Sequence, residues 1–253
     1  MERRTAIVTG AGGLLGGAVA IDLARHGFDV LAVDQEPDAV EQTAKAADAL
    51  GLTVVPHVGD VTMEDEVATY VETAVQRWGR IDAFANNAGI EGPAAPFAEF
   101  PTDAFRKVLE VNVVGVFLGL KHVLPVMLKQ NRGSIINTAS IAGLLGFAEI
   151  AAYTASKHAV IGLTKSAAQE CSGTPVRVNC VCPGQIDSRM LSAIVTGRNP
   201  GATVPIERIV ERTPARRLGE ASEVASIVAF LASDEASYVS GSAYTVDGGR
   251  TAG

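Results

Sequence analysis

Short apolar runs alternate with longer amphipathic segments along most of the chain. Short runs between turn residues are typical of strands in a buried parallel sheet, and the longer segments are typical of helices that cover it. The expected strands are Thr5–Val8, Phe28–Val33, Leu52–Val58, Ile81–Ala85, Gly133–Thr138, Pro175–Cys182 and Ala243–Val246. No repeat or break in composition interrupts the alternation, so the sequence predicts one doubly wound α/β domain over residues 1–253.

Residues 185–218 depart from this alternation. They mix Arg, Pro, Thr and Gly with short apolar pieces, and they follow Pro183-Gly184 at the end of the sixth expected strand. Clusters of such residues between regular segments are typical of loops. We therefore expect an excursion from the sheet that carries one or two short helices and covers a substrate.

Composition limits the classes of function. The net charge of −7 argues against nucleic acid or an anionic membrane as the partner. The three cysteines Cys171, Cys180 and Cys182 are an odd number and lie in no metal-binding pattern. The chain shows no signal peptide and no apolar run approaching the roughly 18 residues of a membrane span. We expect a cytoplasmic protein without a disulfide framework or a metal site.

The turn after the first expected strand is rich in glycine. It reads Thr9-Gly10-Ala11-Gly12-Gly13-Leu14-Leu15-Gly16-Gly17 and leads into a helix. In a strand–turn–helix context, glycines let backbone N–H groups approach a pyrophosphate, and the helix N-terminus adds the positive end of its dipole. A tight turn alone would need fewer than five glycines in eight positions, so phosphate binding is favoured over the merely structural interpretation.

Acidic residues follow the second and third expected strands. An acid in the place of Asp34 can bind the adenosine ribose hydroxyls and repel a 2′-phosphate. No Arg or Lys follows directly, so the sequence predicts NAD as the cofactor, with an acid at the N-terminus of the next helix as the alternative role of Asp34. Asp60, before Val61, could contact adenine or cap the next helix.

Three asparagines lie where buried amides need partners. Asn86 and Asn87 follow the fourth expected strand, and Asn112 lies in an apolar stretch of the helix expected at 102–129. A buried amide is costly unless it is hydrogen-bonded. We therefore expect Asn86 and Asn87 both to join neighbouring strand ends and to contact a cofactor.

Tyr153 and Lys157 stand four residues apart in an expected helix, so they share one face. An ammonium beside a phenol favours the phenolate, and we expect Lys157 to lower the pKa of Tyr153 toward neutrality. That would make Tyr153 a general acid/base. Ser140, after the fifth expected strand, could bind a substrate oxygen on which charge develops. A tyrosine and a lysine at this spacing often occur by chance, so the catalytic interpretation depends on the glycine-rich turn and on Asn86-Asn87-Ala88-Gly89.

Together these motifs resemble the short-chain dehydrogenase/reductase family in its single-domain branch. The resemblance spans nearly the whole chain, and it includes Asn86-Asn87-Ala88-Gly89 and, near the C-terminus, Asp247-Gly248-Gly249. It implies a seven-stranded parallel Rossmann sheet with helices on both faces. It also implies hydride transfer between a nicotinamide and a secondary alcohol or ketone, without a metal. The family usually forms homotetramers through helices like those expected at 102–129 and 153–170 and through the last strand.

The resemblance also implies roles for single residues. Tyr153 would transfer a proton, Lys157 would lower the tyrosine pKa and bind the nicotinamide ribose, and Ser140 would hold the substrate oxygen. Asn112 would support a water relay to the lysine. The expected cofactor-binding residues are Gly10, Gly13, Leu14, Leu15, Gly16, Asp34, Asp60, Val61, Asn87, Ala88, Gly89, Thr138, Tyr153, Lys157, Pro183, Gly184, Ile186 and Ser188.

Leu14 departs from the pattern of the resemblance. The single-domain branch usually has glycine at this position, and the spacing Gly10, Gly13, Gly16 is more similar to that of larger epimerase-type relatives. We predict that Gly13 takes over the close approach to the cofactor.

The substrate pocket is expected between Ser140–Tyr153 and the excursion. Its candidate walls are mostly apolar, which suits a hydrophobic secondary alcohol or ketone, cyclic ones included. The segments Asn86–Gly92 and Leu231–Tyr238 look similar to those of cyclic-alcohol dehydrogenases of the levodione reductase type. Glu91 and Gln185 either orient a polar substituent or face solvent. The expected walls are Ile90, Glu91, Ala142, Leu144, Leu145, Phe147, Ile150, Gln185, Ile186 and Met190.

Two alternatives compete with this interpretation. An NADPH-dependent 3-ketoacyl-carrier-protein reductase belongs to the same family, but Asp34 and the acidic balance of the chain argue against it. A redox sensor would bind NAD without turnover, but the complete set of candidate catalytic residues argues against that. Arg216-Arg217 either recognise an anionic tail of the substrate or form a surface pair.

Overall fold

The computed structural model describes residues 3–198 and 206–252. Its centre is a seven-stranded parallel sheet in the order β3-β2-β1-β4-β5-β6-β7, which confirms the predicted doubly wound fold. The strands are β1 (Arg4–Thr9), β2 (Phe28–Asp34), β3 (Val54–Val58), β4 (Ala83–Asn86), β5 (Gly133–Thr138), β6 (Val176–Pro183) and β7 (Ala243–Val246).

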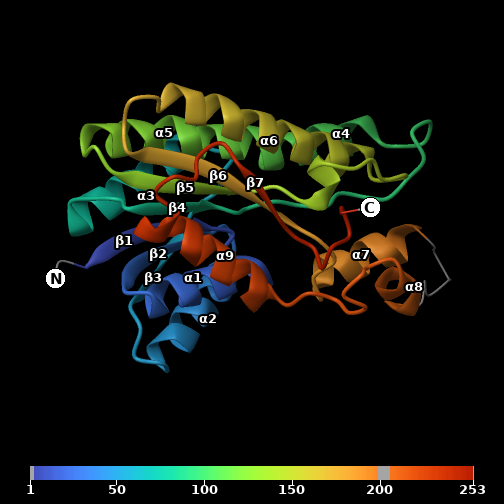
Figure 1. The fold of residues 1–253 in the computed structure, drawn as a ribbon, viewed down its shortest axis with the longest axis horizontal. Helices are drawn as coiled ribbons and strands as arrows, with labels where there is room; N and C mark the ends of the chain where they lie inside the picture. Colours follow the sequence, from blue (N-terminus) through green and yellow to red (C-terminus); the bar gives the residue numbers. More distant parts are fainter. Residues whose placement is uncertain (1–2, 199–205, 253) are drawn as a thin grey trace.

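Helices cover both faces of the sheet (Figure 1). Side chains that alternate along each strand feed two buried apolar clusters, so that Ile7 and Val8 lie in different ones. The helices on one face are α1 (Leu14–Arg25), α2 (Pro37–Asp48) and α9 (Ala221–Ala232). Those on the other are α3 (Glu64–Trp78), α4 (Thr102–Leu109), α5 (Gly115–Lys129) and α6 (Ala151–Glu170).

The stretch expected as one helix at 102–129 is divided by a π-helical segment, Glu110–Val114, with the buried Asn112 at its centre. Such segments frequently occur at functional sites. The whole stretch of 28 residues is long and apolar enough to cross a membrane, contrary to the expectation from the sequence. In its most apolar window, 44% is buried inside the fold.

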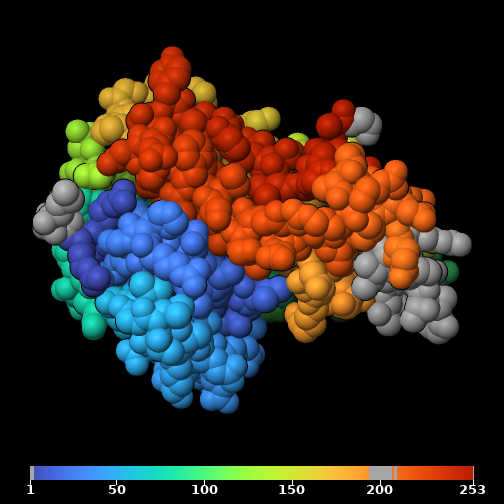
Figure 2. Space-filling model, turned by 60° about the horizontal axis from the view of Figure 1, so that its bottom comes forward, coloured from blue at the N-terminus to red at the C-terminus, as the bar shows by residue number. Residues whose placement is uncertain are grey.

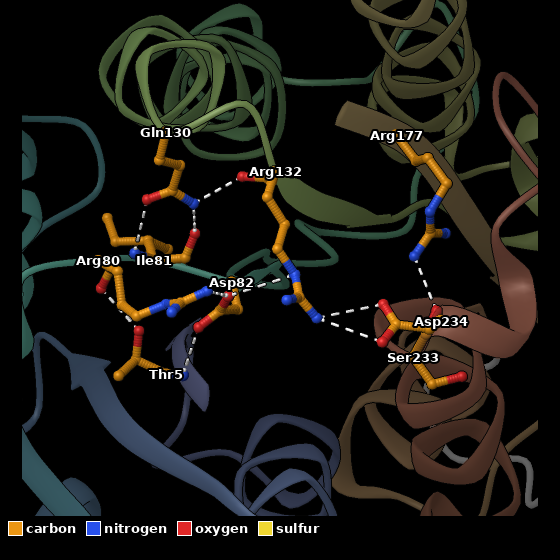
Figure 3. A network of polar contacts seen from close by, with 9 residues as sticks. All are labelled: Thr5, Arg80, Ile81, Asp82, Gln130, Arg132, Arg177, Ser233 and Asp234. Carbon is orange, nitrogen blue, oxygen red and sulfur yellow. Dashed lines mark hydrogen bonds and ion pairs between the residues drawn. The ribbon is translucent and has the colours of Figure 1, made fainter. Parts of the chain in front are cut away.

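Charged side chains are paired at the amino ends of the strands (Figure 3). Asp82, just before β4, accepts hydrogen bonds from the backbone N–H of Thr5 at 2.9 Å and from Arg80 at 2.5 Å. The guanidinium of Arg132 lies 3.8 Å from the same carboxylate and also pairs with Asp234 at 3.2 Å. This network ties β1, β4 and β5 to the segment after α9.

Arg177 extends this amino-edge network to β6. It is buried and donates to the carbonyl oxygens of Leu231 and Ser233, at 2.8 and 2.9 Å. These carbonyls belong to the last turn of α9 and the residue after it, where backbone acceptors lack partners within the helix. A cation at this end of a helix also complements the helix dipole.

The predicted excursion is present and contains α7 (Arg189–Arg198) and α8 (Ile206–Glu211). It stands out at one end of the molecule, in orange beside the C-terminal segment (Figures 1 and 2). Two backbone hydrogen bonds hold its ends together: Asp187 N–H donates to Gly219 and Gly219 N–H donates to Gln185, at 3.0 and 2.9 Å. Residues 199–205 of the excursion lie outside the described residues.

Candidate active site

The carboxyl ends of β1, β4 and β5 are joined by the amide of Asn87. Its nitrogen donates to the Thr9 carbonyl at 3.0 Å, and its oxygen accepts from the Thr138 hydroxyl at 3.2 Å. Asn86 is buried and donates to Asn137 at 3.2 Å and to the Val116 carbonyl at 3.0 Å. The predicted role of the two asparagines in joining strand ends is confirmed.

The glycines of the turn differ in what the fold requires of them. Gly10 has φ of +66°, and a Cβ added to Gly16 would lie 2.1 Å from the Gly10 carbonyl oxygen. Gly13 has φ of −81°, and an added Cβ would meet only that oxygen, at 3.4 Å. Gly13 therefore leaves space before the N-terminus of α1 that packing does not need. The unpaired N–H groups of that first helical turn fit a pyrophosphate.

Asp34 supports this turn from the end of β2. Its carboxylate accepts hydrogen bonds from the N–H groups of Gly12 at 2.8 Å and Glu36 at 3.1 Å. The N-cap residue of α2 is Glu36, so Asp34 does not cap that helix, but it lies just before the helix N-terminus, as the alternative role requires. Asp60 likewise caps no helix: it accepts from the backbone and hydroxyl of Thr62, both at 2.8 Å, in the turn before α3.

Tyr153 and Lys157 lie in the first two turns of α6, and both are buried. The Tyr153 phenol is hydrogen-bonded to the Ser140 side chain. Ser140 also caps the 3-10 turn Ile141–Gly143, where its hydroxyl accepts from the Ala142 N–H at 3.1 Å. The Lys157 amine donates to the Thr138 carbonyl at 2.8 Å. The structure thus brings Ser140, Tyr153 and Lys157 together at the carboxyl end of β5.

The predicted pKa of Tyr153 is wrong in this structure. Burial raises the pKa of Tyr153, the hydrogen bond with Ser140 opposes this rise, and the nearby Glu91 carboxylate adds to it, so that the pKa is about 12. Lys157 does not lower it, because its amine is directed at Thr138 and lies 5.5 Å from the centre of the tyrosine ring. Burial also lowers the pKa of Lys157, to about 8.

Asn112 connects the π-helical segment to the site. Its amide oxygen accepts from the Ile90 N–H at 2.8 Å, and its nitrogen donates to the Ile90 carbonyl at 2.9 Å and to Ser156 at 3.0 Å. The side chain therefore clamps the loop after β4 against α6. These three bonds use both amide hydrogens and one of the two acceptor positions of the oxygen. The support of a water relay to Lys157 stays a prediction.

The apolar walls predicted for the substrate pocket meet around Tyr153. Ala142 and Ile150 form a small buried cluster with it, and Phe147 and Met190 pack against this cluster. Ala94 also joins it and was missed, because no local pattern marks one alanine of a Pro/Ala-rich loop. Leu144, another predicted wall, is exposed.

The polar walls lie in different places. Glu91 lies near Tyr153 and pairs with Arg189 of α7 at 3.6 Å. Arg189 was missed because it lies about a hundred residues away in the chain. Gln185 instead lines a cavity of about 270 Å³ between the excursion and the C-terminal segment, shared with Arg217 and Glu223.

Four further predicted cofactor residues lie between the end of β6 and the start of α7. Pro183 ends β6, and Gly184 packs so closely on Asp247 that an added Cβ would lie 2.7 Å from its Cα. Ile186 is buried and pairs with Gly219. The Ser188 hydroxyl accepts from the Leu191 N–H at 3.2 Å, at the beginning of α7.

Arg216 and Arg217 are engaged at the surface. Arg217 donates to both oxygens of Glu223, at 2.6 and 2.7 Å, and Arg216 donates to the Glu211 carbonyl at 2.8 Å. This arrangement favours the surface pair over recognition of an anionic tail.

The chain is similar to known proteins over almost its full length. A family model described as enoyl-(acyl carrier protein) reductase matches residues 10–251. Levodione reductase of Leifsonia aquatica is 39% identical over 98% of this chain and 94% of that protein. A solved structure of levodione reductase has a TM-score of 0.95 at 40% identity and covers 98% of both chains.

Other relatives differ in the substrates and cofactors that their names state. Cyclohexanol dehydrogenase of Acinetobacter sp. (strain SE19) is 36% identical over 99% of this chain and 96% of that protein. The 3-oxoacyl-acyl-carrier-protein reductase of Thermotoga maritima is 37% identical over 98% of each. Among solved structures, NAD+-bound xylitol dehydrogenase has a TM-score of 0.92 at 35% identity, over 97% of this chain and 98% of that one. A structure of actinorhodin polyketide ketoreductase with NADPH has a TM-score of 0.93 at 33% identity, over 98% of this chain and 97% of that one.

These similarities agree with the geometry at the carboxyl ends of the strands, where a tyrosine, a lysine and a serine meet beside a glycine-rich turn. The relatives are dehydrogenases and reductases that act on CH–OH groups or on the corresponding carbonyls. The chain therefore belongs to the short-chain dehydrogenase/reductase family and is an oxidoreductase.

Proposed function

We propose that this protein interconverts a hydrophobic secondary alcohol, cyclic ones included, and its ketone, with NAD(H) as the cofactor. The observation that carries the proposal is the cluster of apolar side chains, Ala142, Phe147, Ile150 and Met190, that packs around Tyr153. A pocket with apolar walls and few polar groups binds the carbon skeleton and leaves the polar groups to orient the reacting oxygen. The relatives named for levodione and cyclohexanol support this substrate class.

Ser140 and Tyr153 would act on the substrate oxygen. Nicotinamide, when bound, supplies or accepts the hydride. In ketone reduction the Tyr153 phenol would donate its proton, and the raised pKa of Tyr153 keeps that proton in place at neutral pH. The Ser140 hydroxyl would hold the same oxygen as charge develops on it.

Alcohol oxidation makes the opposite demand on Tyr153, which would then accept a proton. The positive charge of Lys157 would favour the phenolate if the amine turned from the Thr138 carbonyl toward the phenol. Lys157 can make this change because its nitrogen has a backbone carbonyl, and no carboxylate, as its hydrogen-bond acceptor. We propose that cofactor binding and this reorientation occur together.

The preference for NAD rests on Asp34 beside the glycine-rich turn. Its carboxylate would accept from the ribose hydroxyls and repel a 2′-phosphate. The pyrophosphate would lie at the first turn of α1, with Gly13 beside it. Lys157 would contact the nicotinamide ribose, and the Ser188 hydroxyl the carboxamide.

Initial rates over a panel of cyclic and linear secondary alcohols test the proposal, with NAD and NADP run in parallel. We expect NADH formation with a cyclic alcohol and at least about a tenfold preference for NAD, since a repelled phosphate costs more than about 1.4 kcal/mol. Turnover confined to NADPH with a 3-ketoacyl thioester would instead establish the carrier-protein reductase, which the relative from Thermotoga maritima favours as the second candidate.

We also propose that the protein acts as a cytoplasmic homotetramer. On α5, Phe117 and Leu128 are exposed apolar side chains, and β7 is only partly buried at the edge of the sheet. Both surfaces lie where the family resemblance implies contacts between subunits. Light scattering at several protein concentrations would measure the assembled mass.

A further inference from the structure

Glu91 has a fixed place beside the reacting groups. The residue before it, Ile90, has both its N–H and its carbonyl bound by the Asn112 amide, at 2.8 and 2.9 Å. The backbone from which the Glu91 side chain extends is therefore held against α4–α5 and α6. The carboxylate is close enough to Tyr153 for its charge to raise the pKa of the phenol.

This carboxylate is mostly buried and weakly satisfied. Its side chain is 13% exposed, and the partner found among the described residues is the 85% exposed guanidinium of Arg189, at 3.6 Å. That distance is longer than a hydrogen bond. A carboxylate withdrawn from water is costly unless its oxygens accept hydrogen bonds. Glu91 therefore retains the capacity to accept hydrogen bonds inside the pocket.

The rest of the pocket offers little to compete for this role. Ala94, Ala142, Phe147, Ile150 and Met190 present carbon and sulfur atoms around Tyr153. Gln185, the other polar wall expected from the sequence, lines the separate cavity near Arg217. A polar substituent on a substrate whose reacting oxygen lies at Tyr153 would therefore meet Glu91.

We propose that Glu91 is a specificity-determining residue that accepts a hydrogen bond from a second hydroxyl of the substrate. The enzyme then prefers diols and hydroxyketones over simple alcohols and ketones, and it rejects substrates with an anionic group in that place. The inference rests on the proposed function, because it concerns the same pocket. The positive charge of Arg189 partly compensates the Glu91 carboxylate, and at 3.6 Å it leaves the carboxylate oxygens free to accept a hydrogen bond from the substrate.

Paired substrates test this inference. The values of kcat/KM for cyclohexane-1,2-, 1,3- and 1,4-diols would be divided by that for cyclohexanol, in the wild type, Glu91→Gln and Glu91→Ala. We expect the best ratio to fall about tenfold or more in Glu91→Ala, as for the loss of a hydrogen bond to a charged group. Glu91→Gln should keep part of the ratio, because its amide oxygen still accepts, and should also improve turnover of 4-hydroxycyclohexanecarboxylate.

Glu99→Gln is the matched control, since Glu99 is an exposed carboxylate on the same loop after β4. It should leave every ratio as in the wild type. Calorimetry would also measure the dissociation constants of the diols and of cyclohexanol from the enzyme–NADH complex. Their ratios test Glu91 even without turnover. An equal ratio in the wild type and Glu91→Ala by both methods would overturn the inference. Absence of cyclohexanol turnover with NAD, with the binding ratio preserved, would overturn the proposed reaction alone.

Discussion

Asp82 at the amino ends of the strands and Lys157 at the carboxyl ends are both almost fully buried, yet their surroundings differ. Asp82 accepts from a backbone N–H and from Arg80, with Arg132 nearby, so opposite charges surround it. Lys157 donates to the carbonyl of Thr138, and burial lowers its pKa to about 8. At the amino edge of the sheet the buried carboxylate is paired with cations. At the carboxyl edge the buried amine of Lys157 has only a carbonyl as its hydrogen-bond partner among the described residues, and its pKa lies close to neutral pH.

The difference separates stability from chemistry. A charge paired inside the fold is costly to remove, because its partners lose their compensation. A buried group without such a partner changes protonation at a pKa set by its surroundings, and such groups cluster at functional sites. Substitutions at the amino edge should therefore affect unfolding, whereas those at the carboxyl edge should affect turnover.

The largest effect is expected from Tyr153→Phe. The change removes the proposed proton donor and should lower kcat/KM about 1,000-fold, within the range of general acid/base catalysis. The melting temperature should stay close to that of the wild type, because the ring and its packing remain. The control is Tyr70→Phe in α3, outside the proposed active site. It removes another buried tyrosine hydroxyl, one that has no hydrogen-bond partner among the described residues. If both variants kept wild-type rates, Tyr153 would have no role in proton transfer.

At the amino edge, Asp82→Ala should lower the free energy of unfolding by about 3 kcal/mol, because Arg80 and the Thr5 N–H lose their shared partner. The rate per folded molecule should change little. Urea denaturation followed by circular dichroism measures the first quantity. Asp103→Ala is the control: its carboxylate is 96% exposed and pairs with Arg106, so about 0–1 kcal/mol is expected. Equal losses in the two variants would remove the contrast between the edges.

The glycine-rich turn gives the next comparison. Gly13→Ala should raise the dissociation constant of NAD about tenfold while changing the melting temperature little, because within the fold the added methyl meets only the Gly10 carbonyl oxygen, at an ordinary contact distance of 3.4 Å. Gly16→Ala should destabilise the fold itself, since its Cβ would lie 2.1 Å from the Gly10 carbonyl oxygen. Titration calorimetry and thermal unfolding separate the two effects. An unchanged dissociation constant in Gly13→Ala would show that Gly13 does not take over the role of the glycine that is missing at position 14.

The smallest effect concerns the pH dependence of stability. The pKa of Lys157 is about 8 in the folded chain and 10.5 as its ordinary value. Between these values the unfolded chain binds a proton that the folded lysine has released, so this group makes stability rise with pH. Above 10 the raised pKa of Tyr153 acts in the opposite direction, because the unfolded phenol loses its proton first.

Lys157→Met should remove this contribution. Between pH 8 and 10 the free energy of unfolding of the wild type should rise relative to that of the variant by less than about 1.4 kcal/mol per pH unit. Urea midpoints at half-unit intervals of pH would measure the difference. Parallel profiles would mean that the lysine charge is stabilised as well in the fold as in water.

Much of the fold was predictable because its signals are local. The strands β5 and β7 begin and end at the predicted residues, and the other strands differ by a few residues at their ends. The π-helical segment was not predicted, because the apolar periodicity continues through Glu110–Val114 and only the partners of Asn112 reveal its purpose.

The site was predictable in its residues and less so in its electrostatics. Helical spacing placed Tyr153 and Lys157 on one face, and both are indeed buried there. Spacing says nothing of desolvation, so the direction of the Tyr153 pKa shift was wrong. The sequence predicted both Gln185 and Glu91 as polar walls of the substrate pocket. Only the tertiary structure shows that Gln185 lines another cavity, whereas Glu91 lies opposite Arg189.

The sequence by itself determined the order of strands and helices, the glycine-rich turn and the set of polar residues at the strand ends, because periodicity and spacing act over a few residues. The tertiary structure decided where charges point and which are compensated. Lys157 is directed at Thr138, Asp82 is surrounded by cations, and Glu91 lies opposite Arg189. These relations join residues far apart in the chain, and their energies depend on burial, which no local pattern records.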